Sequence, residues 1–431
     1  NSEDGAVSGP AVPAVARRGG RLAAAVPTTA SSTGPLALAD VNGNGQLDLF
    51  VGGRVIAGRW PEAAASRLFL RAGDGWREDP RAAEAFKEAG LVTGAVFSDL
   101  DGDGDPDLVL ATEWGPVRVF LNEGGVFTER TRELGLDAYR GWWQGVATGD
   151  LDGDGRPEII AANFGRNTRH ERWRSAGPLW VHFGDFNGNG AVELLEARTD
   201  PASGRLVAER TLGSVARAMP WVQERFVTFE AFARAGVAEI LGEFAGSARE
   251  LEVNWLESAV FFLRDGKYMP VPLPPEAQRA PAFAVCVADA NGDGHEDVFL
   301  SQNLFCVQPE AARMDAGRGL WLLGDGRGGL RGVESGVAVY GEQRGAALAD
   351  FDGDGRVDLV VAQNGAATRL FRNTGATPGV RVRLVPGVPQ ALPGRTIRGA
   401  SARACASSVT AAPARRGKSR PAPVGSRKTA R

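Results

Sequence analysis

Short apolar runs alternate along this chain with polar loops rich in Asp, Asn and Gly. Residues 35–39 precede the first such loop and residues 47–51 follow it, and similar runs occupy 94–97, 283–287 and 358–361. Runs of four or five apolar, often β-branched residues between turn signals are typical of buried strands. The pattern therefore predicts that each loop connects two strands.

The loops share one design, which occurs six times. In each of them a side chain that carries oxygen lies at positions 1, 3, 5 and 9, and glycine lies at positions 4 and 6. They span 40–48 (loop one), 99–107 (loop two), 150–158 (loop three), 185–193 (loop four), 289–297 (loop five) and 350–358 (loop six). Calcium binds about six to eight oxygen atoms, and glycine permits the sharp turn that brings them together. The loops are therefore predicted to be structural Ca²⁺ sites.

The expected ligands are the oxygen-bearing side chains and the backbone oxygen at position 7. They are Asp40, Asn42, Asn44, Gln46 and Asp48; Asp99, Asp101, Asp103, Asp105 and Asp107; Asp150, Asp152, Asp154, Arg156 and Glu158; Asp185, Asn187, Asn189, Ala191 and Glu193; Asp289, Asn291, Asp293, His295 and Asp297; and Asp350, Asp352, Asp354, Arg356 and Asp358. The alternative is an Asx-turn without an ion. This ion-free alternative is strongest for loops one and four, which carry two carboxylates each.

The commonest calcium motif does not fit these loops. An EF-hand has a helix on each side of its loop and a bidentate Glu at position 12. Here position 12 is apolar in five of the six loops, and the flanking segments have the pattern of strands. We therefore expect the ion to lie between two strands of a sheet.

A second hairpin often follows the loop, as in residues 67–76, 117–127 and 320–330. Asp-Gly and Gly-Gly are typical of hairpin turns, and two hairpins in succession make a four-stranded antiparallel unit. Repeated units of this kind predict an all-β fold, a β-propeller with about seven blades, six of them with calcium loops. Helical spacing after a potential N-cap at Thr228 predicts one helical insertion, at about 221–243 in the fourth visible blade, which the hairpin at 259–273 would complete.

The two ends of the chain differ from its middle. Residues 1–34 are expected to be a linker or a truncated blade, residues 35–379 the propeller, and residues 380–431 a further segment with a basic tail. From residue 386 onward there is no Asp, Glu or aromatic residue. A disordered tail and a shift of the reading frame near Val385 both explain this composition. A nucleic-acid-binding arm is disfavoured because no aromatic residue is interleaved with the basic ones.

Other chemistry has weaker support in the sequence. The three Cys provide no disulfide framework, and Cys286 is expected to be a buried free thiol and not a partner of Cys306. His170 and His182 have no Cys nearby, which disfavours a zinc site. No nucleophile elbow, phosphate loop or dinucleotide motif is present, so no catalytic residues are assigned.

Several aromatic and polar residues near the ends of expected inner strands could form a ligand platform. They are Trp114, Trp142, Trp143, Asn163, Arg166 and Trp173. The alternative explanation is packing in the core or between blades, which is the usual role of large aromatic side chains. Both explanations remain open at the level of sequence.

Residues 341–355 (GEQRGAALADFDGDG) and 363–373 (QNGAATRLFRN) resemble a known family. They look like the FG-GAP/VCBS repeats of integrin-α-like propellers, and more closely like bacterial secreted proteins related to cartilage acidic protein, which end in an ASPIC/UnbV domain. The resemblance covers about residues 35–385, and it implies calcium-dependent binding or adhesion outside the cytoplasm. In that family a β-rich domain would begin near Val380.

The function expected from these observations is that of a non-enzymatic, calcium-stabilised binding module. We expect a monomer that is secreted, periplasmic or on the cell surface, with an extracellular protein or glycan as partner and with neither nucleic-acid binding nor a membrane span. The alternative is a secreted propeller enzyme acting on polysaccharide. Carboxylate or His side chains clustered away from the calcium loops would favour that enzyme.

Overall fold

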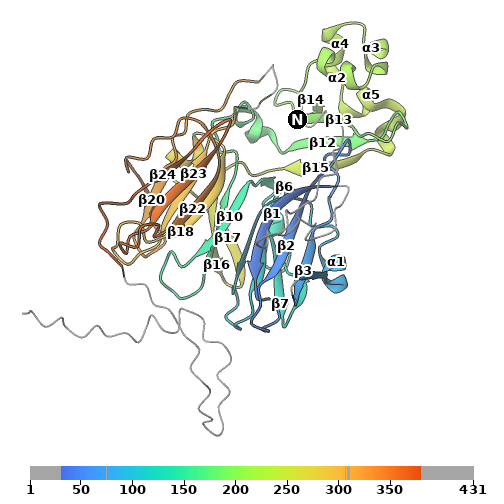
Figure 1. Ribbon diagram of the computed structural model, residues 1–431. Helices are drawn as coiled ribbons and strands as arrows, with labels where there is room; N and C mark the ends of the chain where they lie inside the picture. Colours follow the sequence, from blue (N-terminus) through green and yellow to red (C-terminus); the bar gives the residue numbers. More distant parts are fainter. Residues whose placement is uncertain (1–30, 74, 306, 308–310, 380–431) are drawn as a thin grey trace, which may run out of the picture. The chain divides into compact units, whose positions relative to one another are not determined.

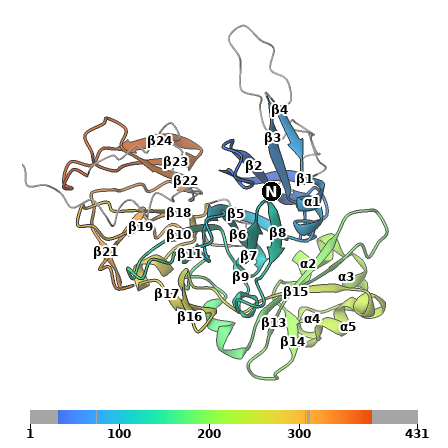
Figure 2. The same cartoon turned by 90° about the horizontal axis from the view of Figure 1, so that it is seen from below.

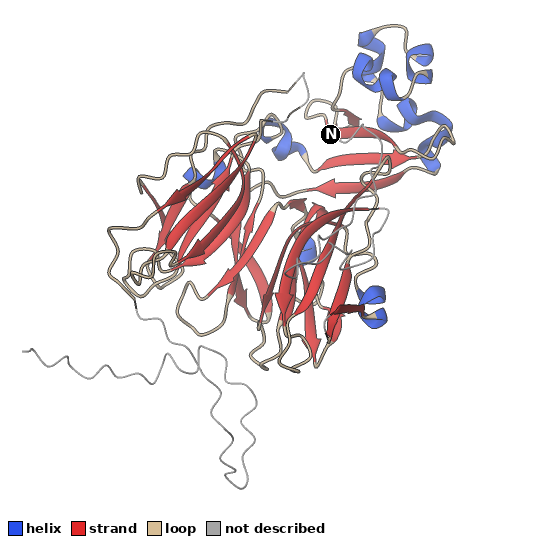
Figure 3. Ribbon diagram, in the orientation of Figure 1, coloured by secondary structure: helices blue, strands red, loops and turns tan. Residues whose placement is uncertain are grey.

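The computed structural model describes residues 31–73, 75–305, 307 and 311–379. These residues form short antiparallel sheets, and helices are few and short (Figures 1 and 3). The fold is therefore mostly β, as the alternation of apolar runs and polar loops predicts. Residues 1–30 and 380–431, which include most of the expected linker and all of the tail, lie outside the described residues, as does Cys306. Residues 31–34 of the expected linker belong to the first strand.

Five sheets follow one another along the chain and are numbered here in that order. Sheet 1 contains β1 (Ser31–Ala39), β2 (Asp48–Ile56), β3 (Arg67–Ala72) and β4 (Gly75–Glu78). Sheet 2 contains β5 (Leu91–Ser98), β6 (Asp107–Gly115), β7 (Arg118–Glu123) and β8 (Val126–Glu129), and β9 (Gly141–Trp142) pairs with β6; sheet 3 contains β10 (Gly145–Gly149), β11 (Glu158–Ala162), β16 (Ala259–Arg264) and β17 (Lys267–Pro272). Sheet 4 contains β18 (Ala282–Ala288), β19 (Asp297–Gln302), β20 (Leu320–Gly324) and β21 (Leu330–Val333), and sheet 5 contains β22 (Glu342–Ala349), β23 (Asp358–Asn364) and β24 (Ala366–Phe371). In every sheet the acidic loop joins the first strand to the second.

Successive sheets pack face to face through their first strands. β5 lies between β1 and β10, and β18 lies between β10 and β22 (Figure 2). The interfaces between the sheets are apolar and centre on large buried side chains such as Phe50, Trp143, Ile160 and Phe299. Because strand residues alternate between two faces, each of sheets 2, 3 and 4 contributes one row of apolar side chains to the sheet before it and another to the sheet after it.

A sixth sheet lies in the middle of sheet 3 and changes the expected assignment of the hairpin at 259–273. β12 (Leu179–Gly184), β13 (Glu193–Thr199), β14 (Leu206–Ala208) and β15 (Arg249–Val253) form this inserted sheet in the order β14-β13-β12-β15. The hairpin β16–β17 pairs with β11, and not with a strand beside loop four. It therefore completes the sheet of loop three, and loop four belongs to the inserted sheet. The expected count of about seven blades is not confirmed, and no sheet closes on itself in the described part of the chain.

The helices of the insertion are several short pieces. They are α2 (Leu212–Ala218), α3 (Trp221–Arg225), α4 (Phe229–Arg234) and α5 (Val237–Leu241), followed by a 3₁₀ helix at Gly242–Gly246. Thr228 caps α4 by accepting a hydrogen bond from the backbone N–H of Ala231 at 3.2 Å. Further N-termini at Thr211 and Gly236 start separate helices, so the helical insertion expected at about 221–243 consists of several short helices and begins earlier, at Leu212.

The remaining helices are single turns at the margins of the sheets. They are α1 (Pro80–Ala85) and 3₁₀ helices at Leu136–Ala138, Glu171–Ala176 and Pro275–Gln278. None of the helices in the described residues is long and apolar enough to cross a bilayer. Cys286 is a half-buried free thiol on β18.

Asparagine side chains connect neighbouring sheets at the end nearest the loops. Asn122, at the end of β7, donates from Nδ2 to the backbone oxygen of Val41 in loop one at 2.9 Å and to that of Pro106 at 3.1 Å. Asn373 makes the same pair of contacts, with Ala290 of loop five at 2.7 Å and Val357 at 3.2 Å. These amides tie sheet 2 to loop one and sheet 5 to loop five.

We expect Asn122→Ala to destabilise the protein by about 1–3 kcal/mol, because it leaves two carbonyl oxygens without their donor in a buried setting. Asn364→Ala, which changes an exposed asparagine on β23, is the matched control and should stay within about 0.5 kcal/mol of the parent protein. Urea denaturation measures both variants. Equal midpoints for the two would show that the Asn122 amide does not hold the sheets together.

Candidate metal centre

The first carboxylate of each loop holds the turn in shape. In loop two the oxygens of Asp99 accept hydrogen bonds from the backbone N–H groups of Gly102 at 2.8 Å and Gly104 at 3.2 Å. Both glycines have positive φ, 81° and 94°, a conformation that other residues rarely adopt. Loops three, five and six repeat both contacts through their own position 1. In loops one and four the position-1 carboxylate accepts instead from the N–H groups at positions 5 and 6.

Positions 3 and 5 form Asx-turns within the loop. In loop two the carboxylate of Asp101 accepts from the backbone N–H of Asp103 at 3.2 Å, and Asp103 accepts from that of Asp105 at 2.8 Å. The position-5 side chain accepts from the position-7 N–H in all six loops. The side chain of Asp105 turns away from the loop and accepts from Gly124 N–H at 2.7 Å. The Asx-turn considered from the sequence is therefore present at these positions.

Position 9 is the first residue of the second strand, and it is buried in every loop. In loop two one oxygen of Asp107 accepts from the backbone N–H of Leu100 at 2.8 Å, and the other accepts from that of Asn122 at 2.8 Å. The carboxylate thus joins its own loop to the end of the third strand. The same double contact is made by Asp48, Asp297 and Asp358.

Glutamate at position 9 occurs in loop three, whose sheet is interrupted by the insertion, and in loop four, which belongs to the inserted sheet. Glu158 accepts from Leu151 N–H at 2.7 Å, and Glu193 accepts from Phe186 N–H at 2.8 Å and from the side-chain amide of Asn187 at 2.6 Å. In sheet 3 the third strand comes only after the insertion, and in the inserted sheet β15 pairs with β12. The longer side chain therefore occurs where the local order of strands differs from that of the other sheets.

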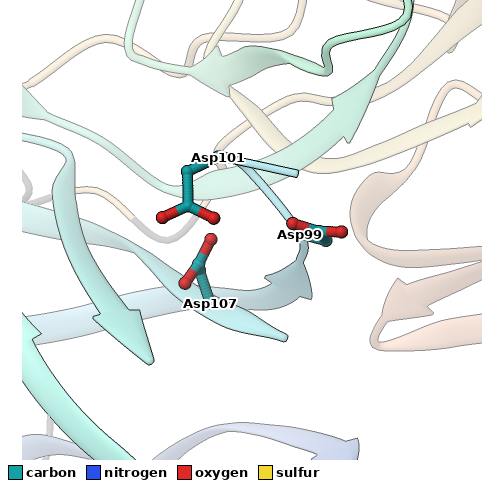
Figure 4. A group of neighbouring side chains, drawn as sticks. All are labelled: Asp99, Asp101 and Asp107. Atoms are coloured by element: carbon teal, nitrogen blue, oxygen red, sulfur yellow. The ribbon is translucent and has the colours of Figure 1, made fainter. Parts of the chain in front are cut away.

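Three loops bring three carboxylates together. In loop two, oxygen atoms of Asp99, Asp101 and Asp107 all lie within 4.8 Å of one another, and Figure 4 shows the carboxylates of Asp101 and Asp107 facing each other. The corresponding groups are Asp150, Asp152 and Glu158 in loop three, and Asp350, Asp352 and Asp358 in loop six. Positions 1, 3 and 9 make up these groups. Position 5, which was expected to contribute, is not a member of them.

Basic side chains neutralise two of the three groups in part. Arg264 lies 3.1 Å from Asp152 in loop three. In loop six Arg372 contacts both Asp352 and Asp354, and Arg356 lies 2.9 Å from Asp354. Within the described residues no ion pair reaches the carboxylates of loop two. Loop two therefore has the largest uncompensated negative charge of the three.

The remaining loops replace carboxylates by amides. In loop one Asn42 donates from Nδ2 to Asp48 at 3.2 Å, and its buried Oδ1 has no hydrogen-bond partner. In loop five Asn291 donates to Asp293 at 2.8 Å, and the carboxylates of that loop do not form a group of the kind seen in loop two. In loops one, four and five a side-chain amide thus donates a hydrogen bond to a carboxylate of the same loop.

Burial and mutual repulsion raise the pKa of several of these acids. Burial, followed by the charges of Asp101 and Asp103, raises the pKa of Asp107 to about 6. Burial and the charges of Asp152 and Asp154 raise the pKa of Glu158 to about 7. The pKa of Asp101 is raised by burial and by its acidic neighbours. A bound cation would favour the ionised form of all these groups.

The donor sets fit a hard cation. They consist of oxygen atoms alone, carry several negative charges and converge from a rigid turn and a buried strand. The unpartnered Oδ1 of Asn42 is an acceptor of the same type in loop one. On these grounds loops two, three and six can hold a metal ion through positions 1, 3 and 9.

The proposed ligand platform is largely buried, which is the packing alternative considered from the sequence. Trp114, Trp142 and Trp143 are 6%, 8% and 0% exposed. Trp142 packs edge-on against Trp114 at 5.4 Å between ring centroids, and Asn163 donates to the backbone oxygen of Trp255. These rings therefore do not offer a flat open surface.

The other two members of the proposed platform lie beside them. Arg166 is half-exposed and contacts Glu171 and Glu257. Trp173 lies in the 3₁₀ helix Glu171–Ala176, and its side chain is outside the described part of the structure.

Residues 99–161 match the family described as FG-GAP-like repeat. This segment runs from loop two through loop three to β11. The chain carries an FG-GAP-like repeat. The match agrees with the resemblance found in the sequence, whereas the ASPIC/UnbV domain named there is not confirmed. No curated protein matches the chain.

Two solved structures are similar over most of this chain. One is the biofilm matrix protein Bap1 of V. cholerae, with 16% identity, a TM-score of 0.30 and coverage of 75% of this chain and 43% of the other. The second is the rhamnogalacturonan lyase YesW, with 14% identity, a TM-score of 0.27 and coverage of 82% of this chain and 63% of the other. The chain thus spans less than two thirds of either protein.

The arginines around the FG-GAP-like loops could not be found from the sequence pattern. Arg264 and Arg372 come from hairpins outside the loops that they neutralise, and nothing in the loop pattern points to them. Asn122 and Asn373 do carry a signal, since both follow a Phe by two residues and precede a Gly by two. That repeated spacing marks the end of the third strand.

The raised pKa values of Asp107 and Glu158 predict an unusual pH dependence for the metal-free protein. Each group has a higher pKa in the folded protein than in the unfolded chain. At a pH between these two values the folded protein binds more protons than the unfolded chain, so the free energy of unfolding falls as the pH rises. With a chelator present, raising the pH from 5.5 to 8 should destabilise the protein, by about 1–2 kcal/mol for Glu158 after solvent screening.

The matched variant is Glu158→Gln, which keeps an acceptor for Leu151 N–H and cannot ionise. It should lose much of this pH dependence in thermal melts recorded across the range. An unchanged slope in the variant would show that Glu158 does not titrate in this way.

Proposed function

We propose that this protein is an extracellular β-propeller whose loops bind Ca²⁺ and which acts as a binding module for a protein or a glycan. The observation that carries the proposal is the carboxylate group of Asp99, Asp101 and Asp107 in loop two, which no basic side chain in the described residues neutralises. Two like charges about 4 Å apart repel by roughly 4 kcal/mol at an effective dielectric constant of about 20. A divalent cation would remove this repulsion.

Calcium is the favoured ion because of the ligand chemistry. Calcium prefers carboxylate and carbonyl oxygens in flexible arrangements, whereas magnesium requires near-octahedral geometry and retains waters. Weak calcium sites fill outside the cytoplasm, where the ion is abundant. The FG-GAP-like repeat and the loops together therefore support an extracellular location.

A propeller is supported by how successive sheets pack. Each sheet of the main series lies against the next through its first strand. The third and fourth strands follow on the far side of the second strand, away from the first. A repeat of this kind places its units around a common axis. The inserted sheet would then be an addition to the third blade.

A ligand site is suggested by a cavity of about 680 Å³ between sheet 2 and the inserted sheet. It is lined by Trp114 and Trp180 and by a mixture of basic and acidic side chains, among them Arg132 and Arg140. Its size is within the usual range for ligand pockets, and aromatic side chains with a few polar groups suit a sugar or a peptide.

The same cavity gives little support to the alternative of a polysaccharide-degrading enzyme. Glu129 is 3.1 Å from Arg118, and Glu252 is 2.6 Å from Arg140. These two carboxylates are thus engaged by arginines, whereas a catalytic acid and base must be placed to exchange protons with a substrate. Binding without catalysis is therefore the proposal for this site.

Calcium should stabilise the parent protein, and the effect should depend most on loop two. Asp101→Ala should remove more calcium-dependent stability than Asn42→Ala, because ligand charge tunes calcium affinity and loop one carries only two carboxylates. Thermal melts of both variants across a calcium titration, with a chelator control, measure this difference. If the melting curve of the parent protein does not respond to chelator, the loops are not calcium sites.

Binding to a glycan or peptide array should depend on the cavity. Arg140→Ala and Arg132→Ala should each weaken the strongest array signal by about tenfold or more, since each removes a cationic hydrogen-bond donor from the lining. Arg234→Ala is the control, because Arg234 is an exposed arginine on α4 paired with Glu230, away from the cavity. Equal signals for all three variants would place the ligand elsewhere.

A further inference from the structure

The five sheets pack on one another through the same two faces. The face that packs against the next sheet along the chain is called here the forward face, and the opposite one the backward face. The forward face of sheet 1, with the cross-strand row Ala37, Phe50 and Leu68, packs against the backward face of sheet 2, which contains Phe97 and Leu108. The forward rows of the next three sheets are Val96, Val109 and Val119; Ala147, Ile160 and Val260; and Cys286, Phe299 and Trp321. All of them except Ala147 lie in the apolar clusters between neighbouring sheets.

The forward face of sheet 5 has no sheet against it in the described residues. Its row in the same register is Ala347, Val360 and Leu370, and Leu370 is 52% exposed. Position 2 of the acidic loop belongs to this face as well. It is 0% exposed in loop one, 5% in loop two and 2% in loop three, but Phe351 in loop six is 73% exposed.

The backward face of sheet 1 is open along its first strand. Leu36 and Leu38 of β1 are 48% and 55% exposed. The residues in their register in sheet 2 are Ala95 and Phe97, which pack into the cluster between sheets 1 and 2. Leu49 and Phe69 of the same face are already buried, and Arg67 lies over the Phe69 ring at 4.7 Å.

The two open faces carry, at equivalent register positions, the same kinds of residues that meet where neighbouring sheets pack within the chain. In sheet 1 the forward positions of the first strand are Ala37 and Ala39, and in sheet 5 the same register places the exposed Ala347 and Ala349. Between sheets 1 and 2, Ala37 and Ala39 share an apolar cluster with the larger Phe97 of the next first strand. Leu36 and Leu38 supply such larger residues at the other end.

We propose that the forward face of sheet 5 docks on the backward face of sheet 1 in a second copy of this chain. The contact continues the series β1, β5, β10, β18, β22 into β1 of the next copy. Because two different faces meet, the interface is heterologous and can extend to a third copy or close into a ring. This departs from the monomer expected from the sequence.

Hydrogen bonding between the sheets follows the same rule. The second hairpin donates to the position-2 backbone oxygen of the preceding loop, as Asn122 does to Val41 and Gly328 N–H does to Leu151 at 2.9 Å. In sheet 1 the register position of Asn122 is Arg71, because the backbone N–H of each donates to the position-9 aspartate of its own sheet. Across the proposed interface Arg71 would donate to the backbone oxygen of Phe351.

The test measures self-association of the full chain by sedimentation velocity over a wide concentration range, with and without calcium. The parent protein should form species larger than a dimer as concentration rises. Phe351→Glu and Leu38→Glu should each abolish this growth, because each places a charge in one of the two faces. Phe229→Glu on α4 is the control, since Phe229 is 70% exposed and lies outside both faces. It should associate like the parent.

Mixing the two interface variants distinguishes this arrangement from a symmetric dimer. The Phe351→Glu copy keeps its sheet 1 face and the Leu38→Glu copy keeps its sheet 5 face, so an equimolar mixture should form dimers and no larger species. A parent protein that stays monomeric at all concentrations overturns the proposal, as does a mixture that stays monomeric. Equal loss of association in Phe229→Glu also overturns it, because the exposed apolar faces would then have no special role.

Discussion

The structure depends on one buried carboxylate in each sheet, at the ninth position of the acidic loop. In loop two Asp107 accepts a hydrogen bond from Leu100 in its own loop and another from Asn122 at the end of the third strand. Because Asp107 also begins the second strand, a single side chain fixes the loop, both hairpins and the register between them. Buried charged acceptors of this kind are stabilising only when their partners are in place.

The same position connects stability with ion binding. The carboxylate that organises the sheet also lies within 4.8 Å of the carboxylates at positions 1 and 3 in loops two, three and six. In loop six Arg372 partly neutralises this charge, whereas loop two has no such partner among the described residues. A cation at loop two would therefore act directly on the sheet framework, and the strength of that coupling should differ from loop to loop.

Local pattern predicted the sheets well and their connections less well. The spacing of Asp, Gly and apolar residues located the strands around every loop, because each hairpin is set by nearby residues. It could not show that β11 pairs with β16 across the insertion, since loop four has the same local pattern as its neighbours. The sequence left open whether Trp142 and Trp143 pack in the core or bind a ligand, because their burial depends on the surrounding sheets. Position 5 stays a predicted ligand, because its side chain accepts one hydrogen bond from the position-7 N–H and has further lone pairs for an ion.

The most direct test of the account is a crystal structure of the full chain grown with calcium, with anomalous scattering used to locate the ions. The account predicts an anomalous peak in loop two, coordinated by Asp99, Asp101 and Asp107, and further peaks in loops three and six. Asp107 should keep its hydrogen bonds to the backbone while it binds the ion. Ordered loops without anomalous density at saturating calcium would contradict the account, because the carboxylates would then be held together by hydrogen bonds alone.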